Sequence, residues 1–135
     1  MLKGNCIHPD LVRVVSRCGH GDQILISDGN YPLASRSGQA EKIYLGLSPG
    51  IPTVTDVLAA LQGIANFEKA QVMQPEQGPD PEIFKEFQAM LDGLELHRLS
   101  RHQFYDACCQ PAVRLAVSTG EGRVYANLLL TVGVV

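Results

Sequence analysis

The sequence predicts an α/β protein whose helices pack on a layered, mixed β-sheet. Segments with the helical spacing of apolar residues alternate along the chain with short apolar segments typical of buried strands. The last two strand-like segments follow one another without a helix between them, which indicates that the sheet is mixed. The chain has 135 residues and no internal repeat, so we expect residues 1–135 to form a single domain with its own core.

The first half of the chain predicts a helix, two strands and the start of a second helix. In residues 9–17 the apolar side chains recur at the spacing of one helical face, with proline in the first turn and glycine just past the end. Residues 24–26 are a short apolar run that leads into the sequence Ser-Asp-Gly-Asn, which is typical of a buried strand that enters a loop. Residues 42–47 resume a strand, and Thr53 or Thr55 can cap the helix that follows.

The second half predicts two further helices and the strands that complete the sheet. The sequence Asp-Pro-Glu at residues 80–82 has the chemistry of a helix start. Ser100 and Gln103 have the spacing of a capping box, so we expect a short helix that continues through Tyr105. The predicted strands are residues 67–73, 112–117 and 125–132, the last two joined by Gly120-Glu121-Gly122, and residues 94–99 alternate in a strand-like way.

Composition excludes several classes of function. The net charge is −3, with 11 basic and 14 acidic residues and no basic run, so the chain is not built to bind nucleic acid. No apolar run approaches the length of a membrane span, so we expect no membrane association. The N-terminus lacks the apolar core of a signal peptide, and we therefore expect a cytoplasmic location.

The four cysteines fit neither a zinc site nor a secreted disulfide framework. Cys6 and Cys18 stand alone, and Cys108 and Cys109 are adjacent, a geometry that rarely forms a bridge. We expect reduced thiols in or near the core, although a redox or metal role for the adjacent pair stays open. The chain also lacks the motifs of nucleotide, metal and hydrolase sites, so an enzyme of this sequence would work without cofactor or metal, by acid–base chemistry.

Polar residues gather in four places at the ends of predicted elements, where α/β proteins form their sites. His20 follows the first helix, Asp28 follows the first strand, and Arg101 opens the helix near the C-terminus. Tyr125 and Asn127 lie two residues apart, so a strand over residues 125–132 would place both on one face.

Each of these four places also has a purely structural explanation. His20 could contact the carbonyl end of its helix, and Asp28 could form the turn with the glycine and asparagine that follow. Arg101 could be a solvated helix residue, and Tyr125 could pack against a neighbouring strand. Spacing alone therefore indicates no more than an α/β domain with several polar loops.

The ordered set of motifs resembles the ribose pyranase and fucose mutarotase family. The N-terminal part of the resemblance is residues 17–22, with Gly-His-Gly-Asp around His20, followed by residues 24–28 and Asn-Tyr-Pro at residues 30–32. The C-terminal part is Ser-Thr-Gly-Glu at residues 118–121, then Tyr-Ala-Asn and an apolar tail that includes Gly133. The resemblance implies a three-layer α/β/α fold with a mixed, mostly parallel sheet. It also implies a ring-shaped homo-oligomer of about ten subunits with sites near subunit boundaries.

The resemblance assigns roles to the five candidate residues. His20 matches the family's proton donor, and the sugar-contacting positions fall on Asp28, Arg101, Tyr125 and Asn127. Opening a cyclic sugar requires protonation of the ring oxygen and removal of the anomeric hydroxyl proton, and a histidine can do both near neutral pH. We therefore expect a monosaccharide substrate and no cofactor.

Two sugars compete as the substrate. Arg101 and the Phe-Tyr-Asp at residues 104–106 resemble the fucose type, whereas Tyr-Ala-Asn at residues 125–127 and residues 46–52 are closer to the ribose type. We favour an L-fucose mutarotase because Arg101 would touch the substrate while Ala126 would point away from it. A D-ribose pyranase is the alternative, and a non-catalytic sugar-binding module is a third interpretation.

Overall fold

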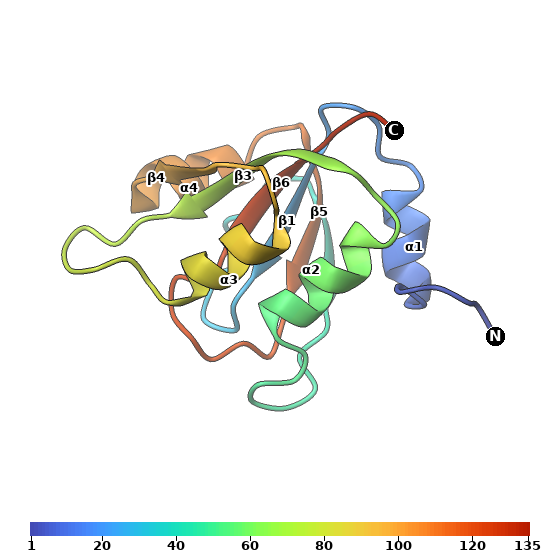
Figure 1. The fold of residues 1–135 in the computed structure, drawn as a ribbon, viewed down its shortest axis with the longest axis horizontal. Coiled ribbons are helices and arrows are strands. Elements are labelled where there is room, and N and C mark those ends of the chain that lie inside the picture. Colours follow the sequence, from blue (N-terminus) through green and yellow to red (C-terminus); the bar gives the residue numbers. More distant parts are fainter.

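The computed structural model describes residues 1–135 and contains one six-stranded sheet and four helices (Figure 1). The strands are β1 (Gln23–Ser27), β2 (Glu41–Tyr44), β3 (Phe67–Met73), β4 (Leu96–Leu99), β5 (Val113–Ser118) and β6 (Leu128–Val132). The helices are α1 (Pro9–Val15), α2 (Val54–Gln62), α3 (Ile83–Met90) and α4 (Arg101–Cys108). The prediction for β3 is confirmed residue for residue, and β2 ends earlier than predicted.

The sheet is mixed and mostly parallel, as the family resemblance implied. Its strand order is β2-β5-β1-β6-β3-β4. The pairs β2–β5, β5–β1 and β3–β4 are parallel, whereas β6 is antiparallel to both of its neighbours, β1 and β3. Five strands therefore share one direction and only β6 runs against them. The final two strands of the chain are not neighbours, because β1 lies between them.

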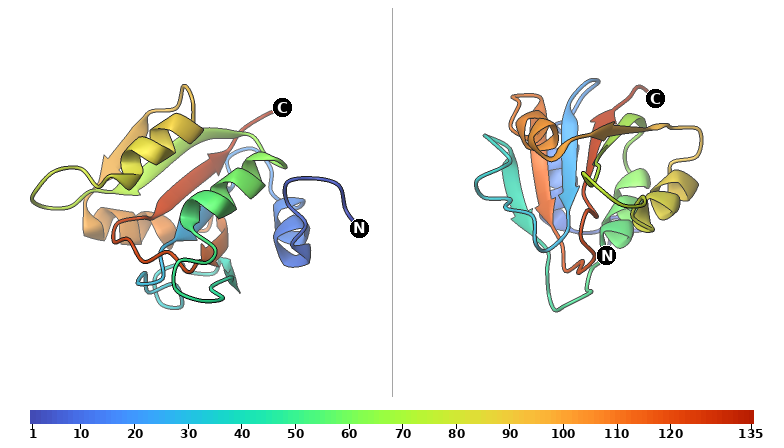
Figure 2. Two further views of the ribbon diagram at one scale, coloured as in Figure 1. Left: turned by 60° about the horizontal axis from the view of Figure 1, so that its bottom comes forward. Right: turned by 90° about the vertical axis from the view of Figure 1, so that its left-hand side faces the viewer.

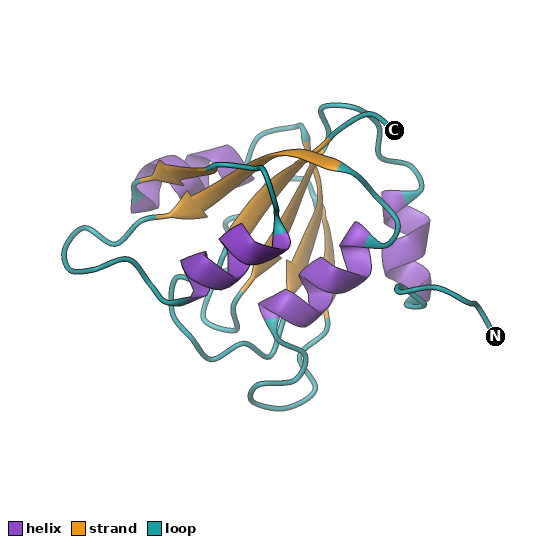
Figure 3. Cartoon of the chain, in the orientation of Figure 1, coloured by secondary structure: helices purple, strands orange, loops and turns teal.

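Helices cover both faces of this sheet and give three layers. In the right-hand view of Figure 2, α4 (orange) lies on one side of the strands, and α2 (green) and α3 (yellow) lie on the other. Ile24 and Ile26 pack with α1, α2 and α3 in the larger apolar cluster, whereas Leu25 between them packs with α4 in the smaller one. Alternate residues of the same strand thus bury opposite faces of the sheet, which confirms the α/β/α architecture. Figure 3 shows the long loops that connect the layers.

Local capping chemistry sets where three of the helices begin. Thr53 and Asp56 form a capping box at the start of α2, so Thr53 rather than Thr55 is the cap. Ser100 and Gln103 form the predicted capping box of α4, which continues past residue 105 to Cys108. The His8 side chain accepts the backbone N–H of Leu11 at 3.3 Å and caps α1.

The predicted strand over residues 125–132 is wrong at its beginning. β6 starts at Leu128, and Tyr125 has a φ of 61°, in the left-handed region that a pleated strand does not use. This turn interrupts the alternation of the strand, so Tyr125 and Asn127 do not share a strand face. Ala126 is fully buried in the larger apolar cluster, which holds the turn against the core.

All four cysteines are unpaired thiols, as expected from their spacing. Cys6 and Cys108 are buried, and Cys18 and Cys109 are half-buried. Burial raises the pKa of the Cys108 thiol to about 12, so this thiol is protonated and unreactive. None of the four helices has both the length and the apolar character that crossing a bilayer requires.

A buried carboxylate fastens the loop between β5 and β6. Glu121 is 4% exposed, and its Oε1 accepts the backbone N–H and the Nε–H of Arg123 at 3.1 and 3.0 Å. Arg123 also donates to Glu86 on α3 at 2.5 Å, and the Glu121 carbonyl accepts the N–H of Gly29 at 2.8 Å. The loop is thus tied both to a helix and to the chain that leaves β1.

We predict that Glu121→Gln destabilises the protein in a pH-dependent way. The Arg123 guanidinium lowers the pKa of the Glu121 carboxyl below its usual 4.5. The stabilisation is therefore complete above pH 4.5 and is lost as pH falls through the lowered folded pKa. Urea unfolding at pH 7 should show a loss of about 1–3 kcal/mol, as for hydrogen bonds to charged groups, and the loss should shrink at pH 3.

Glu86→Gln is the matched control, because Glu86 contacts the same guanidinium from a half-exposed position. It should cost less than about 1 kcal/mol at pH 7. An equal loss for Glu121→Gln at pH 7 and pH 3 would show that the ion pair is not the cause.

Candidate functional site

A cavity of about 250 Å³ lies at the edge of the sheet where the five co-directional strands end. Its volume is slightly below the ~300–1,000 Å³ typical of sites for drug-sized ligands, so it suits a small molecule. It brings together four of the five residues predicted from the sequence. The lining residues are Asp28, Asn30, Tyr31, Pro32, Met73, Arg101, Tyr105, Val124, Tyr125 and Asn127.

The direction of the strands explains why these residues meet. Asp28 follows the end of β1, Met73 ends β3, and Arg101 follows β4 after the capping residue. These three strands run the same way, so their carboxyl ends share one edge, where α/β sheets form their sites. β6 runs the other way, so the residues that precede it, Tyr125 and Asn127, reach the same edge.

Asp28 and Asn127 form a reciprocal pair at the base of the cavity. The Asn127 Oδ1 accepts the Asp28 N–H at 3.0 Å, and the Asn127 Nδ2 donates to Asp28 Oδ2 at 3.1 Å. The other Asp28 oxygen accepts the N–H of Asn30 at 2.8 Å. Asp28 therefore forms the turn that its sequence indicates and also lines the cavity. Burial raises the pKa of the Asp28 carboxyl, and these hydrogen bonds oppose the rise.

Arg101 and Tyr125 supply free polar groups at the mouth of the cavity. Arg101 is the first residue of α4, directly after the Ser100 cap, and its exposed guanidinium makes no hydrogen bond within the chain. Tyr125 is half-buried, its backbone is left-handed, and its side chain packs against the smaller apolar cluster. A non-glycine residue with positive φ costs about 1–3 kcal/mol and is common at functional sites. Both groups remain available to a ligand.

Two aromatic side chains that were not among the five predicted residues also line the cavity. Tyr31 is 7% exposed and donates its hydroxyl to the Arg36 carbonyl at 2.8 Å. Its ring meets the Tyr105 ring edge-on, with the centroids 5.6 Å apart. Burial raises the pKa of Tyr31 far above its usual value, so the hydroxyl stays neutral. The Asn-Tyr-Pro motif after the first strand was the signal that could have identified Tyr31.

His20 does not join the other four residues within one chain. It lies in the loop between α1 and β1, so it precedes the strand that Asp28 follows. Asp22 and Asp28 flank β1, and roughly 20 Å of extended chain separates the two edges of the sheet. The His20 side chain is 60% exposed, and its Nε2 lies 2.9 and 3.0 Å from the two carboxylate oxygens of Glu68. In Figure 1 this loop lies beside the C-terminus, far from the start of α4.

The structural explanation of His20 as a helix-end residue is wrong. α1 ends at Val15, and the N–H groups after it bond within the turn. His20 instead bonds with Glu68 at the beginning of β3. No pattern in the sequence singled out Glu68, because one exposed glutamate in a strand has no distinctive spacing.

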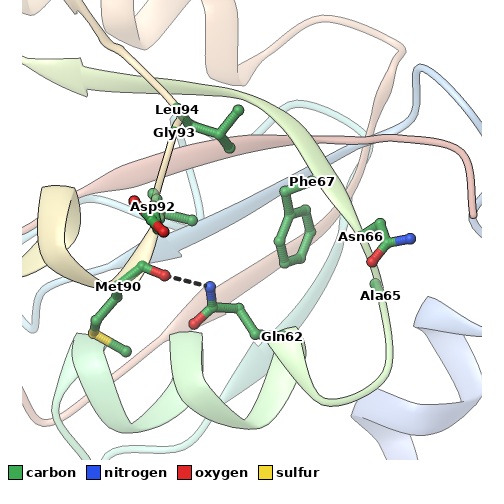
Figure 4. A pocket seen from close by; sticks show the side chains of 9 residues that line it. Gln62, Ala65, Asn66, Phe67, Met90, Asp92, Gly93 and Leu94 are labelled. Atoms are coloured by element: carbon green, nitrogen blue, oxygen red, sulfur yellow. Dashed lines mark hydrogen bonds between the residues drawn. The ribbon is translucent and has the colours of Figure 1, made fainter.

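A second cavity, of about 350 Å³, lies between the ends of α2 and α3 (Figure 4). Its one internal hydrogen bond joins the Gln62 amide to the Met90 carbonyl at 2.8 Å. Asp92 is its only charged side chain, and none of the five predicted residues lines it. The smaller cavity has more converging polar groups and is the better candidate site. In neither place do three or more His, Cys, Asp or Glu side chains gather as a metal site would need.

The chemistry of the smaller cavity suits a small neutral polyol. Asp28 accepts hydrogen bonds, Arg101 donates them, and Tyr125 and Asn127 can do both. The Tyr31 and Tyr105 rings add an apolar surface on which a sugar ring can lie. No histidine lines the cavity, and Asp28 is its only carboxyl group.

The chain is similar over its full length to proteins that bind or isomerise sugars. The model of the RbsD / FucU transport protein family matches residues 1–135. The D-ribose pyranase of Laribacter hongkongensis is 30% identical over 100% of this chain and 99% of its own. The structure of Bacillus subtilis RbsD with D-ribose has a TM-score of 0.87 and 27% sequence identity. The match covers 100% of this chain and 99% of that one. The structure of the Streptococcus pneumoniae fucose mutarotase with L-fucose has a TM-score of 0.79 and 29% sequence identity. The match covers 96% of this chain and 94% of that one.

We predict that Asn127→Asp, beside Asp28 in the cavity, makes the free energy of unfolding fall as the pH rises from 5 to 8. The new carboxylate would face Asp28, whose pKa burial already raises. Two buried carboxylates in contact favour protonation of one, so the folded form binds more protons than the unfolded form above pH 4. The variant should lose about 1–3 kcal/mol at pH 7 and recover stability as the pH falls toward 5.

Thermal unfolding between pH 5 and pH 8 measures this effect, and Gln88→Glu on the exposed side of α3 controls for the added charge. The control should follow the wild-type curve. An Asn127→Asp curve parallel to that of the wild type would contradict the placement of the pair.

Proposed function

The chain belongs to the RbsD / FucU transport protein family, and we propose that it is a cofactor-independent sugar mutarotase. Such an isomerase interconverts the ring forms of a monosaccharide by opening and closing the ring. The observation that carries the proposal is the polyol-sized cavity in which Asp28, Arg101, Tyr125 and Asn127 converge. Similar folds with D-ribose or L-fucose bound support the same class of ligand.

D-Ribose is the better supported substrate. Two curated relatives that match the chain over its full length carry the name D-ribose pyranase, and the D-ribose complex has the higher TM-score of the two sugar-bound structures. The preference for L-fucose drawn from the sequence rests mainly on Arg101. We therefore propose interconversion of pyranose and furanose forms of D-ribose first and of L-fucose anomers as the alternative.

The four residues of the cavity would bind the sugar, and His20 would move the protons. Ring opening breaks the bond between the anomeric carbon and the ring oxygen. The ring oxygen gains a proton, the anomeric hydroxyl loses one, and an open-chain aldehyde results. Closure by the reverse steps then forms another anomer or another ring size. The Arg101 guanidinium would steady negative charge on the opening oxygen.

The position of His20 supports a site that is completed by a second copy of the chain. Since His20 and the cavity lie at opposite edges of the sheet, we propose that one protomer supplies His20 to the cavity of the next. Contact between two different edges is heterologous, and repetition of such a contact forms a ring when the rotation between neighbours closes. Val124 at the cavity and Val134 near the His20 edge are 61% and 69% exposed, which fits burial in an interface. A ring-shaped homo-oligomer of about ten subunits remains the expected assembly.

We predict that His20→Ala abolishes the acceleration of ring exchange. NMR saturation transfer on D-ribose and L-fucose measures the exchange rate directly. Loss of a general acid–base group typically costs about 10²–10⁴-fold, so the rate should approach that of buffer. His97→Ala, on exposed β4, is the matched control and should keep full activity.

Saturable sugar binding without any acceleration by the wild-type protein would instead identify a sugar-binding module. Faster exchange of L-fucose than of D-ribose would reverse the order of the two proposed substrates.

A mixing experiment tests whether neighbouring protomers share their sites. His20→Ala and Arg101→Ala chains should each be inactive alone. Unfolded together and refolded as a mixture, they should regain activity, because about a quarter of randomly assembled sites combine an intact His20 with an intact Arg101. Each variant refolded alone is the control. A mixture as inactive as its components would show that each site belongs to one chain.

A further inference from the structure

The His20–Glu68 contact restricts which nitrogen of His20 carries a proton. His20 Nε2 lies 2.9 and 3.0 Å from the two Glu68 oxygens. An ionised carboxylate only accepts hydrogen bonds, so Nε2 must be the donor. The neutral imidazole then carries its single proton on Nε2, which leaves Nδ1 free as an acceptor. Nδ1 makes no hydrogen bond within the chain.

A β-bulge aims Glu68 at His20. The register of β3 against β6 shifts between Phe67 and Lys69, so Glu68 is the extra residue of the strand and leaves the regular alternation. Its Cβ lies close to Gly133, where an added Cβ would stand only 3.1 Å away. A side chain at Gly133 would therefore crowd Glu68.

The loop that carries His20 is tied to the same end of β6. Gly21 donates its N–H to the Val132 carbonyl at 2.9 Å, and Val132 donates to the Asp22 carbonyl at 2.8 Å. Asp22 is the carboxylate within this loop, and its Oδ2 already accepts the N–H of Gly19 at 2.8 Å. Glu68 is thus the carboxylate left to contact the imidazole, and β6 fixes both partners.

Stability does not explain this pair. The His20 and Glu68 side chains are 60% and 44% exposed, and exposed ion pairs contribute about 0–1 kcal/mol at most. We propose that Glu68 is the positioning residue for His20, which holds the neutral ring as the Nε2–H tautomer and presents Nδ1 to the sugar. This inference rests on the proposed function.

The tautomer provides a test that does not depend on activity. In ¹⁵N-labelled wild-type protein at pH 8, long-range NMR correlations should show His20 with its proton on Nε2. Glu68→Ala should give a mixture of tautomers. Glu68→Gln, whose amide oxygen can still accept from Nε2–H, should restore the single tautomer. Glu95→Ala, which removes another exposed carboxylate, should leave His20 unchanged.

Exchange rates complete the test. In metal sites, loss of a carboxylate that orients a histidine costs about 10–100-fold in activity. By analogy, Glu68→Ala should slow sugar exchange by about 10-fold or more, and Glu68→Gln should recover part of the rate. An unchanged tautomer or an unchanged rate in a folded Glu68→Ala protein overturns the inference. If His20→Ala loses exchange while Glu68→Ala keeps it, the inference alone fails. If His20→Ala keeps exchange, the proposed role of His20 fails and the inference fails with it. If the wild-type protein does not accelerate exchange, the proposed function itself fails.

Discussion

The candidate site depends on the reciprocal hydrogen bonds between Asp28 and Asn127. They join the end of β1 to the beginning of β6, and they exist because β6 runs against its neighbours. Tyr31 comes directly after the turn that Asp28 forms, and Tyr125 lies two residues before Asn127. The positions of both tyrosines in the cavity therefore depend on this pair. A buried carboxylate is costly in free energy, and here its cost is offset by an amide and a backbone N–H.

The layers and most of the elements could be predicted from the sequence. Apolar periodicity and capping residues are local signals, so the bounds of β3, the capping box of α4 and one of the two candidate caps of α2 followed from them. The start of β6 could not be predicted in this way. A single left-handed backbone at Tyr125 ends the pleat, and its side chain carries no sign of that conformation. The insertion of β1 between β5 and β6 is likewise a long-range choice that adjacent segments do not encode.

The composition of the site was predictable in part. Asp28, Arg101, Tyr125 and Asn127 line one cavity, although the reason offered for the last two, a shared strand face, was wrong. Family resemblance grouped His20 with them, yet a residue before a strand and a residue after it lie at opposite edges of a sheet. Strand direction would have revealed the separation from sequence alone. The contact between Glu68 and His20 could not be predicted, because it depends on a shift in the register of β3 against β6.

The distance between His20 and the cavity also bears on how such a protein can diverge. Under the proposed function, the residues that bind the sugar and the residue that moves the proton lie at opposite edges of the sheet in the folded protomer. In the proposed assembly, selection could therefore alter Arg101 or Tyr105 to accommodate another sugar while the opposite edge keeps its chemistry. Relatives that share one reaction but prefer different sugars are the expected outcome of that separation.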